Sequence, residues 1–478
     1  MKLAKASILY RALRNSASFG AIFIFSRGFS IQEVNLIAVL SIIIGAGLII
    51  GVNIVWQYLI WRNYNLNLEE NNLKITKGVL SKEDRKIPFD RIQNVDIKRN
   101  IVHRLMGISQ LNVETAGGNK TEASIKHLRS EDATQLRNNL SEGETADTNE
   151  GSQRQPEYQI RKKELALLSL TSIDGRFIAA VGTLFGVAPS IMESTIEEIS
   201  LDPTAGSAIL LIGGIGATWA LGAASTFLRY WKFKLYENED SLRYERGLLN
   251  RAEGEIPLQK IQKLTVEENL AQRILGYATL KIDTAGYSPT QSATKGPEAA
   301  IPLAKQDRIE EISKKVADTT KTPPEAITTK ARRRYVFRYT LLSLISSSVI
   351  YYFTGSLVLT AALTTVLAAA SAAAGHLKWK NIGYSINKKH VVTSKGFWNH
   401  RTSYIPYFRV QNLIETRSIL QKRWGVSTLD IDTAGTGSIL NRTHIPDVDK
   451  AKARELRQEI FERFQNSLQK TKGEKKQP

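Results

Sequence analysis

The chain has 478 residues, a formal net charge of +19 and no cysteine. A domain usually holds about 100 to 200 residues, so several domains are expected, and the charge predicts an anionic partner, either nucleic acid or the anionic face of a membrane. The lack of cysteine excludes disulfides, thiolate metal sites and cysteine nucleophiles.

Apolar segments recur along the chain and predict membrane spans. Residues 36–61 carry no charge, and a helix needs about 20 apolar residues to cross the hydrocarbon core. Residues 205–228 and 355–377 are similar, and each of the three has a weaker apolar segment before it, at 16–31, 165–192 and 335–353. We therefore predict six spans in three pairs. The alternative for each segment is a helix buried in a soluble core.

Basic residues orient these spans. Residues 1–15 hold four Lys or Arg and no acid, whereas residues 191–204 hold four acids and no base. Arg332, Arg333 and Arg334 flank the fifth span. Since Lys and Arg near span ends concentrate on the cytoplasmic side, both termini and the soluble segments are predicted to be cytoplasmic.

One pattern occurs three times between the spans. It is IPFDRIQNVDIKRNIVHRLMGISQLNVETAG from residue 87, IPLQKIQKLTVEENLAQRILGYATLKIDTAG from residue 256 and IPYFRVQNLIETRSILQKRWGVSTLDIDTAG from residue 405. Gly78, Gly247 and Gly396 precede the prolines by ten residues each time. A repeat in constant register indicates one fold used three times.

The repeated unit is mostly predicted as strand. QLNVETAG, TLKIDTAG and TLDIDTAG alternate apolar and polar residues, so their apolar side chains are expected in a core, namely those of Leu111, Val113, Leu280, Ile282, Leu429 and Ile431. NLKITKGVL, SLRYERGLL and HVVTSKGFW predict second arms of hairpins. RLMG, RILG and KRWG predict a helical turn closed by a left-handed glycine.

Each unit then turns helical, most clearly from residue 447. Asp447 is the predicted N-cap, and Leu456, Ile460 and Phe464 recur at a spacing of four. Each unit is thus predicted as a bent antiparallel sheet followed by one helix. Closing the sheet into a barrel would remove exposed strand edges.

These motifs, in the order paired spans, glycine hairpin, Ile-Pro, Gln, helical turn and Thr-Ala-Gly, resemble the bacterial pleckstrin-homology (PH) membrane proteins of the YdbT type. The resemblance covers nearly the whole chain; IQK at 261–263 departs from it, because the other copies have QN there. It implies an α+β membrane protein with three PH-like antiparallel β-barrel domains, each with a C-terminal helix, alternating with transmembrane helix pairs. It also implies no enzymatic activity and no cofactor.

The predicted layout follows from the spans and the repeat. Copy 1 is residues 62–140, copy 2 is residues 232–318 and copy 3 is residues 380–468. The helix pairs occupy 1–61, 161–231 and 335–379, the linkers are 141–160 and 319–334, and a basic tail follows at 469–478.

Basic residues at two repeated positions are candidate contacts to anionic lipid or to a partner. They are Arg91, Lys260 and Arg409 before the glutamine, and Arg104, Arg273 and Lys422 before the glycine. Each could gain about 1 kcal/mol at an anionic leaflet. The sequence favours the alternative interpretation, in which these side chains cover the barrel surface or pair with acids such as Asp96 or Glu267.

Gln93, Gln262 and Gln411 are identical in the three copies. The favoured interpretation is an amide that satisfies buried backbone groups at a barrel corner. A ligand contact is the alternative, so the three glutamines join the candidate positions.

The sequence thus predicts a non-enzymatic multi-pass protein whose cytoplasmic domains act as a scaffold or as a lipid- or protein-binding module. Its partners would be anionic lipids, other membrane proteins or further copies of itself. The six histidines show no metal-ligand spacing, and no phosphate-binding loop or nucleophile elbow occurs. Asp174 and Arg176 motivate the alternative of a transport or export component. Nucleic-acid binding would explain the charge but not its placement.

Overall fold

The computed structural model describes residues 1–12, 14–16, 36–115, 123–141, 155–172, 203–284, 298–434 and 443–474. They form two compact parts, Met1–Gln155 with Arg243–Glu255, and Pro156–Leu242 with Ile256–Pro478. Several predicted features lie outside the described residues: most of the span at 16–31, most of the span at 165–192, Asp174, Arg176 and most of the linker at 141–160.

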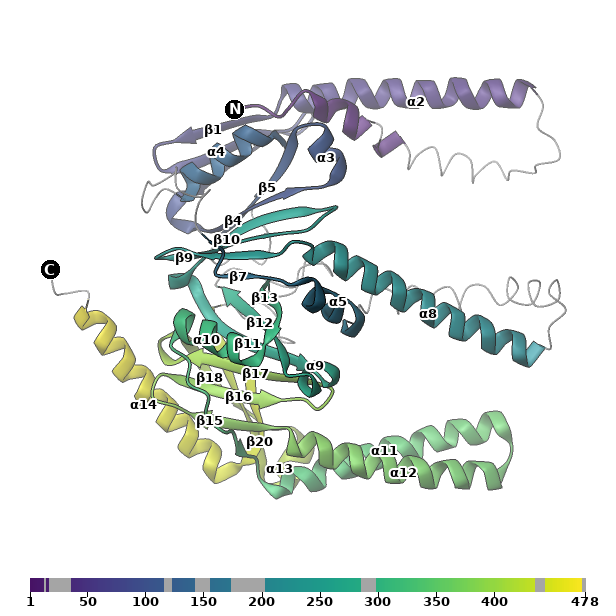
Figure 1. The fold of residues 1–478 in the computed structure, drawn as a ribbon, viewed down its shortest axis with the longest axis vertical. Coiled ribbons are helices and arrows are strands. Elements are labelled where there is room, and N and C mark those ends of the chain that lie inside the picture. Colours follow the sequence, from purple (N-terminus) through teal and green to yellow (C-terminus); the bar gives the residue numbers. More distant parts are fainter. Residues whose placement is uncertain are drawn as a thin grey trace. The chain divides into compact units, whose positions relative to one another are not determined.

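The first part contains copy 1 and a segment of copy 2 (Figure 1). Its strands lie in the orders β1-β2-β3 and β6-β5-β4-β10. The helices are α2 (Leu36–Arg62), α3 (Ile101–Leu105) and α4 (Ser130–Ser141). The strands are β1 (Asn65–Glu69), β2 (Asn72–Lys77), β3 (Glu83–Pro88), β4 (Ile92–Arg99), β5 (Ile108–Thr115), β6 (Ala123–Arg129) and most of β9 (Ser241–Arg246) and β10 (Arg251–Pro257).

The second part contains the rest of copy 2 and copy 3, with sheets in the orders β13-β12-β11-β17-β16-β15-β14 and β18-β19-β20. From copy 2 and its leading segment come β7 (Tyr158–Gln159), α5 (Lys162–Thr171), α8 (Pro203–Tyr230), β8 (Lys234–Glu237), β11 (Ile261–Asn269), α9 (Leu270–Ile274), β12 (Tyr277–Thr284), β13 (Glu298–Lys305) and α10 (Gln306–Ala317). From copy 3 and its leading segment come β14 (Glu325–Ala326), α11 (Thr329–Thr354), α12 (Leu357–Lys380), β15 (Gly383–Ile386), β16 (His390–Lys395), β17 (Asn399–Pro406), β18 (Val410–Thr416), α13 (Ile419–Trp424), β19 (Val426–Thr433), β20 (Thr443–Asp449) and α14 (Lys450–Glu474).

The strands of a copy are divided between two sheets. In copy 1, β3 ends the sheet β1-β2-β3, and β4 belongs to a different sheet. Copy 3 is divided in the same way between β17 and β18. The antiparallel fold expected for each copy is therefore built from two sheets around one core, and β4 and β17 also pair with strands of a neighbouring copy.

The predicted core residues are buried. Leu111, Val113, Leu280, Leu429 and Ile431 are all 0% exposed, and Ile282 is 3% exposed. Because side chains alternate along a strand, the repeated apolar pattern places these residues on the covered face of β5, β12 and β19. The alternation therefore predicted the inward face correctly.

The glycine turns also follow the prediction. Gly107, Gly276 and Gly425 have φ of 63°, 72° and 68°, the left-handed region in which only glycine avoids a steric cost. In each copy the carbonyl of this glycine accepts the backbone N–H of the first residue of the terminal helix, at 3.0 to 3.2 Å from Ser130, Gln306 and Lys450.

The predicted N-cap of the last helix is wrong. Asp447 lies inside β20 with φ of 54° and is 0% exposed, and its carboxylate accepts from Arg334 at 2.7 Å and from Gln421 at 2.7 Å. Asp449 caps α14 instead, since its Oδ1 accepts the N–H of Ala451 at 3.1 Å. The β20 strand runs two residues further than the sequence suggested.

Helices α11 and α12 form an antiparallel hairpin (Figure 1), turned at Gly355, whose φ is 61°. Among the described residues, α12 is the one helix that is both long and apolar enough to cross a membrane. Helices α2 and α8 have 27 and 28 residues, which is sufficient length for a span.

Candidate functional site at the joints between copies

Successive copies are joined strand to strand. We call the pairing of β4 in copy 1 with β10 in copy 2 joint 1, and the pairing of β11 in copy 2 with β17 in copy 3 joint 2. In joint 1, Arg99 lies opposite Arg251. In joint 2, Glu268 lies opposite His400.

These two pairs occupy the same positions of the repeat. Glu268 is the repeat counterpart of Arg99, and His400 is the counterpart of Arg251, because each stands at the same distance from the aligned glycines of its copy. Both joints therefore use one register. Register in a sheet is set by the side chains and turns around it, and the same register recurs at both joints.

At each joint, a repeated arginine of one copy donates a hydrogen bond to the next copy. Arg104 donates from Nη1 to the carbonyl of Leu248 at 3.0 Å, and Arg273 donates from Nη2 to the carbonyl of Phe397 at 3.3 Å. Leu248 and Phe397 both follow the repeated hairpin glycine of the next copy. The Arg273 guanidinium also lies 5.7 Å from the Phe397 ring centre, a cation–π distance.

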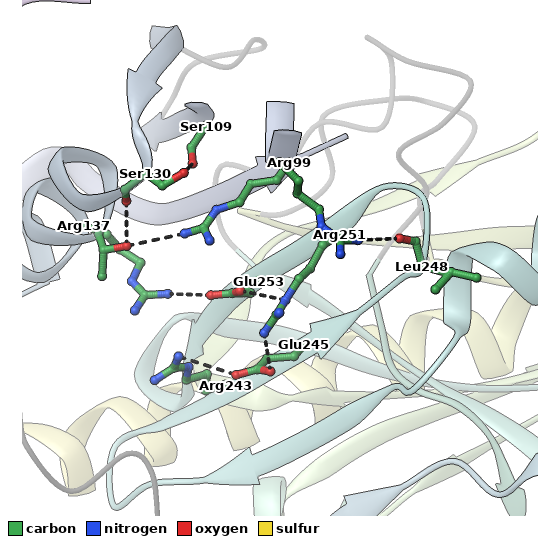
Figure 2. A network of polar contacts seen from close by, with 11 residues as sticks. Arg99, Ser109, Ser130, Arg137, Arg243, Glu245, Leu248, Arg251 and Glu253 are labelled. Carbon is green, nitrogen blue, oxygen red and sulfur yellow. Dashed lines mark hydrogen bonds and ion pairs between the residues drawn. The ribbon is translucent and has the colours of Figure 1, made fainter. Parts of the chain in front are cut away.

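Charged side chains surround joint 1 (Figure 2). Glu253 of β10 pairs with Arg137 of α4 at 3.8 Å and with Arg251 at 3.0 Å. Arg251 also reaches Glu245 at 3.3 Å. Burial, together with neighbouring Arg243, lowers the pKa of Arg137. These acids offset the like charges of Arg99 and Arg251, which face each other across the strands.

Close packing adds to joint 1. A Cβ placed on Gly254 would lie 2.3 Å from the Tyr244 hydroxyl and 2.5 Å from Oδ1 of Asp96. Asp96 is 2% exposed and accepts from that hydroxyl at 3.4 Å. Glycine at this position lets the two strands approach around a buried carboxylate.

Joint 2 replaces these groups by others of similar function. The hydroxyls of Thr265 and Ser403 lie 3.2 Å apart and are buried, and Glu267 pairs with Arg401 across the strands at 2.9 Å. Asp96 and Glu267 are thus both engaged at joints, with Tyr244 and Arg401 rather than with the repeated basic residues.

The structure distributes the six basic candidates unevenly. Arg104, Arg273 and Arg409 each donate to a backbone carbonyl of another copy, Arg409 to that of Gln259. Burial lowers the pKa of Arg409. Lys260 lies half-buried at the end of a 3-10 turn. The side chains of Arg91 and Lys422 are exposed and make no hydrogen bond or ion pair with the part of the chain that the structure describes.

The glutamines also differ from copy to copy. Gln262 is 4% exposed, and its amide donates to the carbonyl of Lys260 at 3.3 Å. Gln411 is exposed on β18. Gln93 is the second residue of β4, after Ile92.

Each copy exposes apolar side chains on its hairpin tip and on its helical turn, and the sequence pattern alone did not single them out. Hairpin tips carry Leu80, Leu249 and Trp398, which are 91%, 39% and 71% exposed. The helical turns carry Leu105, Ile274 and Ile419, which are 83%, 76% and 87% exposed. We call these six residues the apolar rim. The signal in the sequence was an apolar pair after each hairpin glycine (VL, LL and FW) where a turn needs none.

The helical turns that carry the rim adjoin the segments leading into the spans. In copy 2, Asn269 donates to the carbonyl of Thr171 at 2.9 Å, and Gln272 donates to the Thr171 hydroxyl at 3.2 Å. In copy 1, His103 of α3 stacks against Tyr10 at 5.3 Å. In copy 3, α13 packs against α11.

The described residues contain no group of three or more His, Asp or Glu side chains that could hold a metal ion. The transport alternative depends on Asp174 and Arg176, which lie outside the described residues. What the described chemistry offers is strand edges, carbonyls, cations and exposed apolar groups, all of which suit binding.

Comparison with known proteins agrees with the threefold repeat. The family model of the bacterial PH domain matches residues 23–144, 179–320 and 342–464. The UPF0699 transmembrane protein YdbT of Bacillus subtilis (strain 168) is 23% identical over 413 residues, which cover 80% of this chain and 82% of that protein. No solved structure matches the chain. The family matches cover most of the chain and coincide with the three copies, so the chain belongs to the bacterial PH domain family.

Proposed function

We propose that this membrane protein with repeated bacterial PH domains is a non-enzymatic scaffold, whose three domains rest on the cytoplasmic leaflet and present their joints to lipids and partner proteins. The observation that carries the proposal is the apolar rim, because exposed apolar side chains recur in every copy next to the segments that enter the membrane. Basic residues stand among them, namely Arg104, Arg273 and Lys422.

The joints support a multi-pass arrangement. A strand pair cannot cross the bilayer, since open sheet edges do not occur in the hydrocarbon region. Copies 1 and 2 share joint 1, and copies 2 and 3 share joint 2, which supports a proposal in which all copies lie on one side of the membrane. In this proposal the chain between two copies crosses an even number of times, and α11 with α12 would form one such pair.

The span ends are built into the domains. Trp61, at the end of α2, donates from Nε1 to the carbonyl of Leu3 at 2.7 Å and packs on the core of copy 1. Trp379, at the end of α12, donates to the carbonyl of Thr328 at 3.1 Å and packs on the core of copy 3. Trp favours the headgroup level of a membrane. We infer that this anchoring holds copies 1 and 3 at the surface without a flexible linker.

A labelling experiment tests the leaflet contact. The chain has no cysteine, so single substitutions Leu105→Cys, Ile274→Cys and Trp398→Cys accept an environment-sensitive fluorophore without background. In vesicles containing anionic lipid, the three labels should be quenched by a lipid-bound quencher and shielded from aqueous iodide.

Phe461→Cys is the matched control, because Phe461 is an exposed apolar residue (50% exposed) on α14 rather than on the rim. Its label should respond to iodide and not to the lipid quencher. If the rim labels behaved like the Phe461 label, the leaflet contact would be refuted.

A further inference from the structure

Among the residues that the structure describes, two strands lack the neighbour that their counterparts have. Strand β3 of copy 1 is the counterpart of β10 and β17, which pair with the preceding copy, and it ends its sheet. Strand β18 of copy 3 is the counterpart of β4 and β11, which pair with the following copy, and it also ends its sheet. The chain therefore carries half of a joint at each end.

In the sheet β1-β2-β3, residue Met1 covers the edge at β1. Strand β3 is therefore the open edge of this sheet among the described residues. The carbonyl of Met1 accepts the N–H of Leu66 in β1 at 3.0 Å, and the terminal amine of Met1 donates to the Leu66 carbonyl at 2.5 Å. The counterparts of Leu66 are paired in the same way, Leu235 with β7 and Tyr384 with β14.

Side-chain burial differs between β18 and its counterpart β11. In β11, the five residues from Ile261 to Thr265 are all buried. In β18, the counterparts Gln411, Asn412 and Ile414 are exposed, and Leu413 is half-buried. These are the same repeat positions in the same strand, so the difference reflects the strand that covers β11 and is absent from β18.

We propose that a second copy of this chain supplies the missing strand, so that β18 of one molecule pairs with β3 of the next in the register of the two internal joints. In that register Thr416 faces Glu83, as Glu267 faces Arg401 in joint 2. Glu415 then faces Asp84, and Leu413 faces Lys86.

Arg91 and Lys422 make no hydrogen bond or ion pair with the described residues, and the pairing of β18 with β3 of the next molecule, which we call joint 3, would give both of them partners. Lys422 is the counterpart of Arg104 and Arg273, so its ammonium would donate to the carbonyl of Val79, the counterpart of Leu248 and Phe397. Arg91 is the counterpart of Arg409 and would donate to the carbonyl of Phe408. One intermolecular joint thus accounts for both ends of the chain.

Charge on the open edges limits which strands can pair with them. Strand β3 presents Glu83, Asp84, Arg85 and Lys86 in succession, and charged edge strands resist indiscriminate pairing. In the proposed register Glu415 faces Asp84, a like-charge pair, but Lys82 and Lys86 are its diagonal neighbours, and diagonal positions are within reach of long side chains. Joint 1 has the same arrangement, with Arg99 facing Arg251 beside Glu253.

The interface is heterologous, because it joins two different surfaces of the molecule. Such contacts repeat from molecule to molecule and produce rings or rows. Since every copy sits at the same membrane face, the row would lie in the membrane plane.

Cross-linking of the full chain in its membrane tests the proposal. The double variant Glu83→Cys with Thr416→Cys should, on mild oxidation, give a reducible ladder at multiples of the 53.3 kDa chain mass. When the two single variants are co-expressed, the product should stop at a dimer. Adding Lys422→Ala should lower the yield, and Lys422→Arg should keep it.

Two controls fix the meaning of the result. Glu267→Cys with Arg401→Cys holds the equivalent pair in joint 2 and should cross-link within one chain, and Glu83→Cys with Phe461→Cys should give no ladder. The proposal is overturned if the internal pair cross-links and the Glu83 and Thr416 pair does not. It is also overturned if Thr416→Cys alone dimerises or captures a different protein. The fluorophore test of the leaflet contact is independent of both results.

Discussion

At the scale of single residues, one repeat position does a different task in each copy. His127, Leu303 and Asp447 are counterparts near the end of the last strand. His127 stacks on Tyr10 at 5.2 Å, Leu303 accepts the Tyr158 hydroxyl at its carbonyl, and Asp447 pairs with Arg334 at 2.7 Å. Each contact ties a domain to the segment that precedes its own domain. The chemistry varies, but the position of the anchor is kept.

Removing Asp447 should destabilise copy 3 strongly. The Asp447 and Arg334 side chains are 0% and 12% exposed, so Asp447→Ala leaves a buried guanidinium without its partner, at a cost of about 3 to 5 kcal/mol. Asp449→Ala removes an exposed helix cap and should cost about 1 kcal/mol. Thermal unfolding of the detergent-solubilised chain at fixed scan rate should show the larger shift for Asp447→Ala, and equal shifts would contradict the buried pair.

His127 should make the first part sensitive to acid. Burial, with neighbouring Arg11, lowers the pKa of His127 to about 3, so the native imidazole stays neutral while the unfolded one binds a proton below its ordinary pKa of 6.5. Stability is therefore complete above pH 6.5 and falls as the pH drops from 6.5 toward 3. Between pH 7.5 and 5 the loss should be about 2 kcal/mol.

The variant His127→Asn isolates this effect, because asparagine tolerates the φ of 66° at this position and does not titrate. Its unfolding temperature should fall less between pH 7.5 and 5 than that of the unmodified chain. Burial also lowers the pKa of His103, so part of the fall should remain. His444→Asn serves as the control, and a pH response unchanged by His127→Asn would assign the acid sensitivity elsewhere.

At the scale of elements, the joints depend on a close approach of two strands. Gly254→Ala places a methyl group within 2.5 Å of Asp96 and Tyr244, and overpacking of this kind costs about 1 to 3 kcal/mol. Hydrogen exchange of the β4 and β10 amides should speed up in this variant. Gly216→Ala in α8 meets nothing within 4 Å and should leave those amides unchanged. Equal exchange in both variants would mean that joint 1 tolerates a wider strand spacing.

The sequence predicted the elements well and the joints poorly, for physical reasons. Alternation along TLKIDT and the glycine of RILG encode a strand and a turn locally, so Leu280 and Gly276 could be placed without a structure. A strand edge carries no local signature of its neighbour, since any extended backbone can pair. The opposite environments of Gln262 and Gln411, one buried and one exposed, depend on whether another copy follows, and that is not written in either strand.

The same limit explains the misplaced cap. Asp447 and Asp449 stand two residues apart before one helix, and both are good capping residues by type. Only the presence of Arg334 on α11, 113 residues away, assigns Asp447 to a buried ion pair. Likewise, the sequence did not show that Arg104 and Arg273 donate to a carbonyl, because every residue has a backbone carbonyl and its residue type does not mark it as the acceptor.

At the scale of the whole molecule, the joints constrain how the chain crosses the membrane. Joint 1 contains strands of copies 1 and 2, and joint 2 contains strands of copies 2 and 3. Open sheet edges do not occur in the hydrocarbon region, which supports the proposal that all copies lie on one side of the membrane. In that proposal the spans between copies come in even numbers, and among the described residues α12 is long and apolar enough to be one of them.

Single cysteines in the three copies should therefore react from one side only. Glu70→Cys, Glu239→Cys and Phe461→Cys place an exposed thiol in copies 1, 2 and 3, and the chain has no other cysteine to interfere. Because basic residues flank the span ends, that side should be the cytoplasm. A membrane-impermeant maleimide added to intact cells should label none of the three, and permeabilisation should expose all three. Labelling of one copy alone from outside would require an odd number of crossings beside it, which the strand pairing of the joints does not allow.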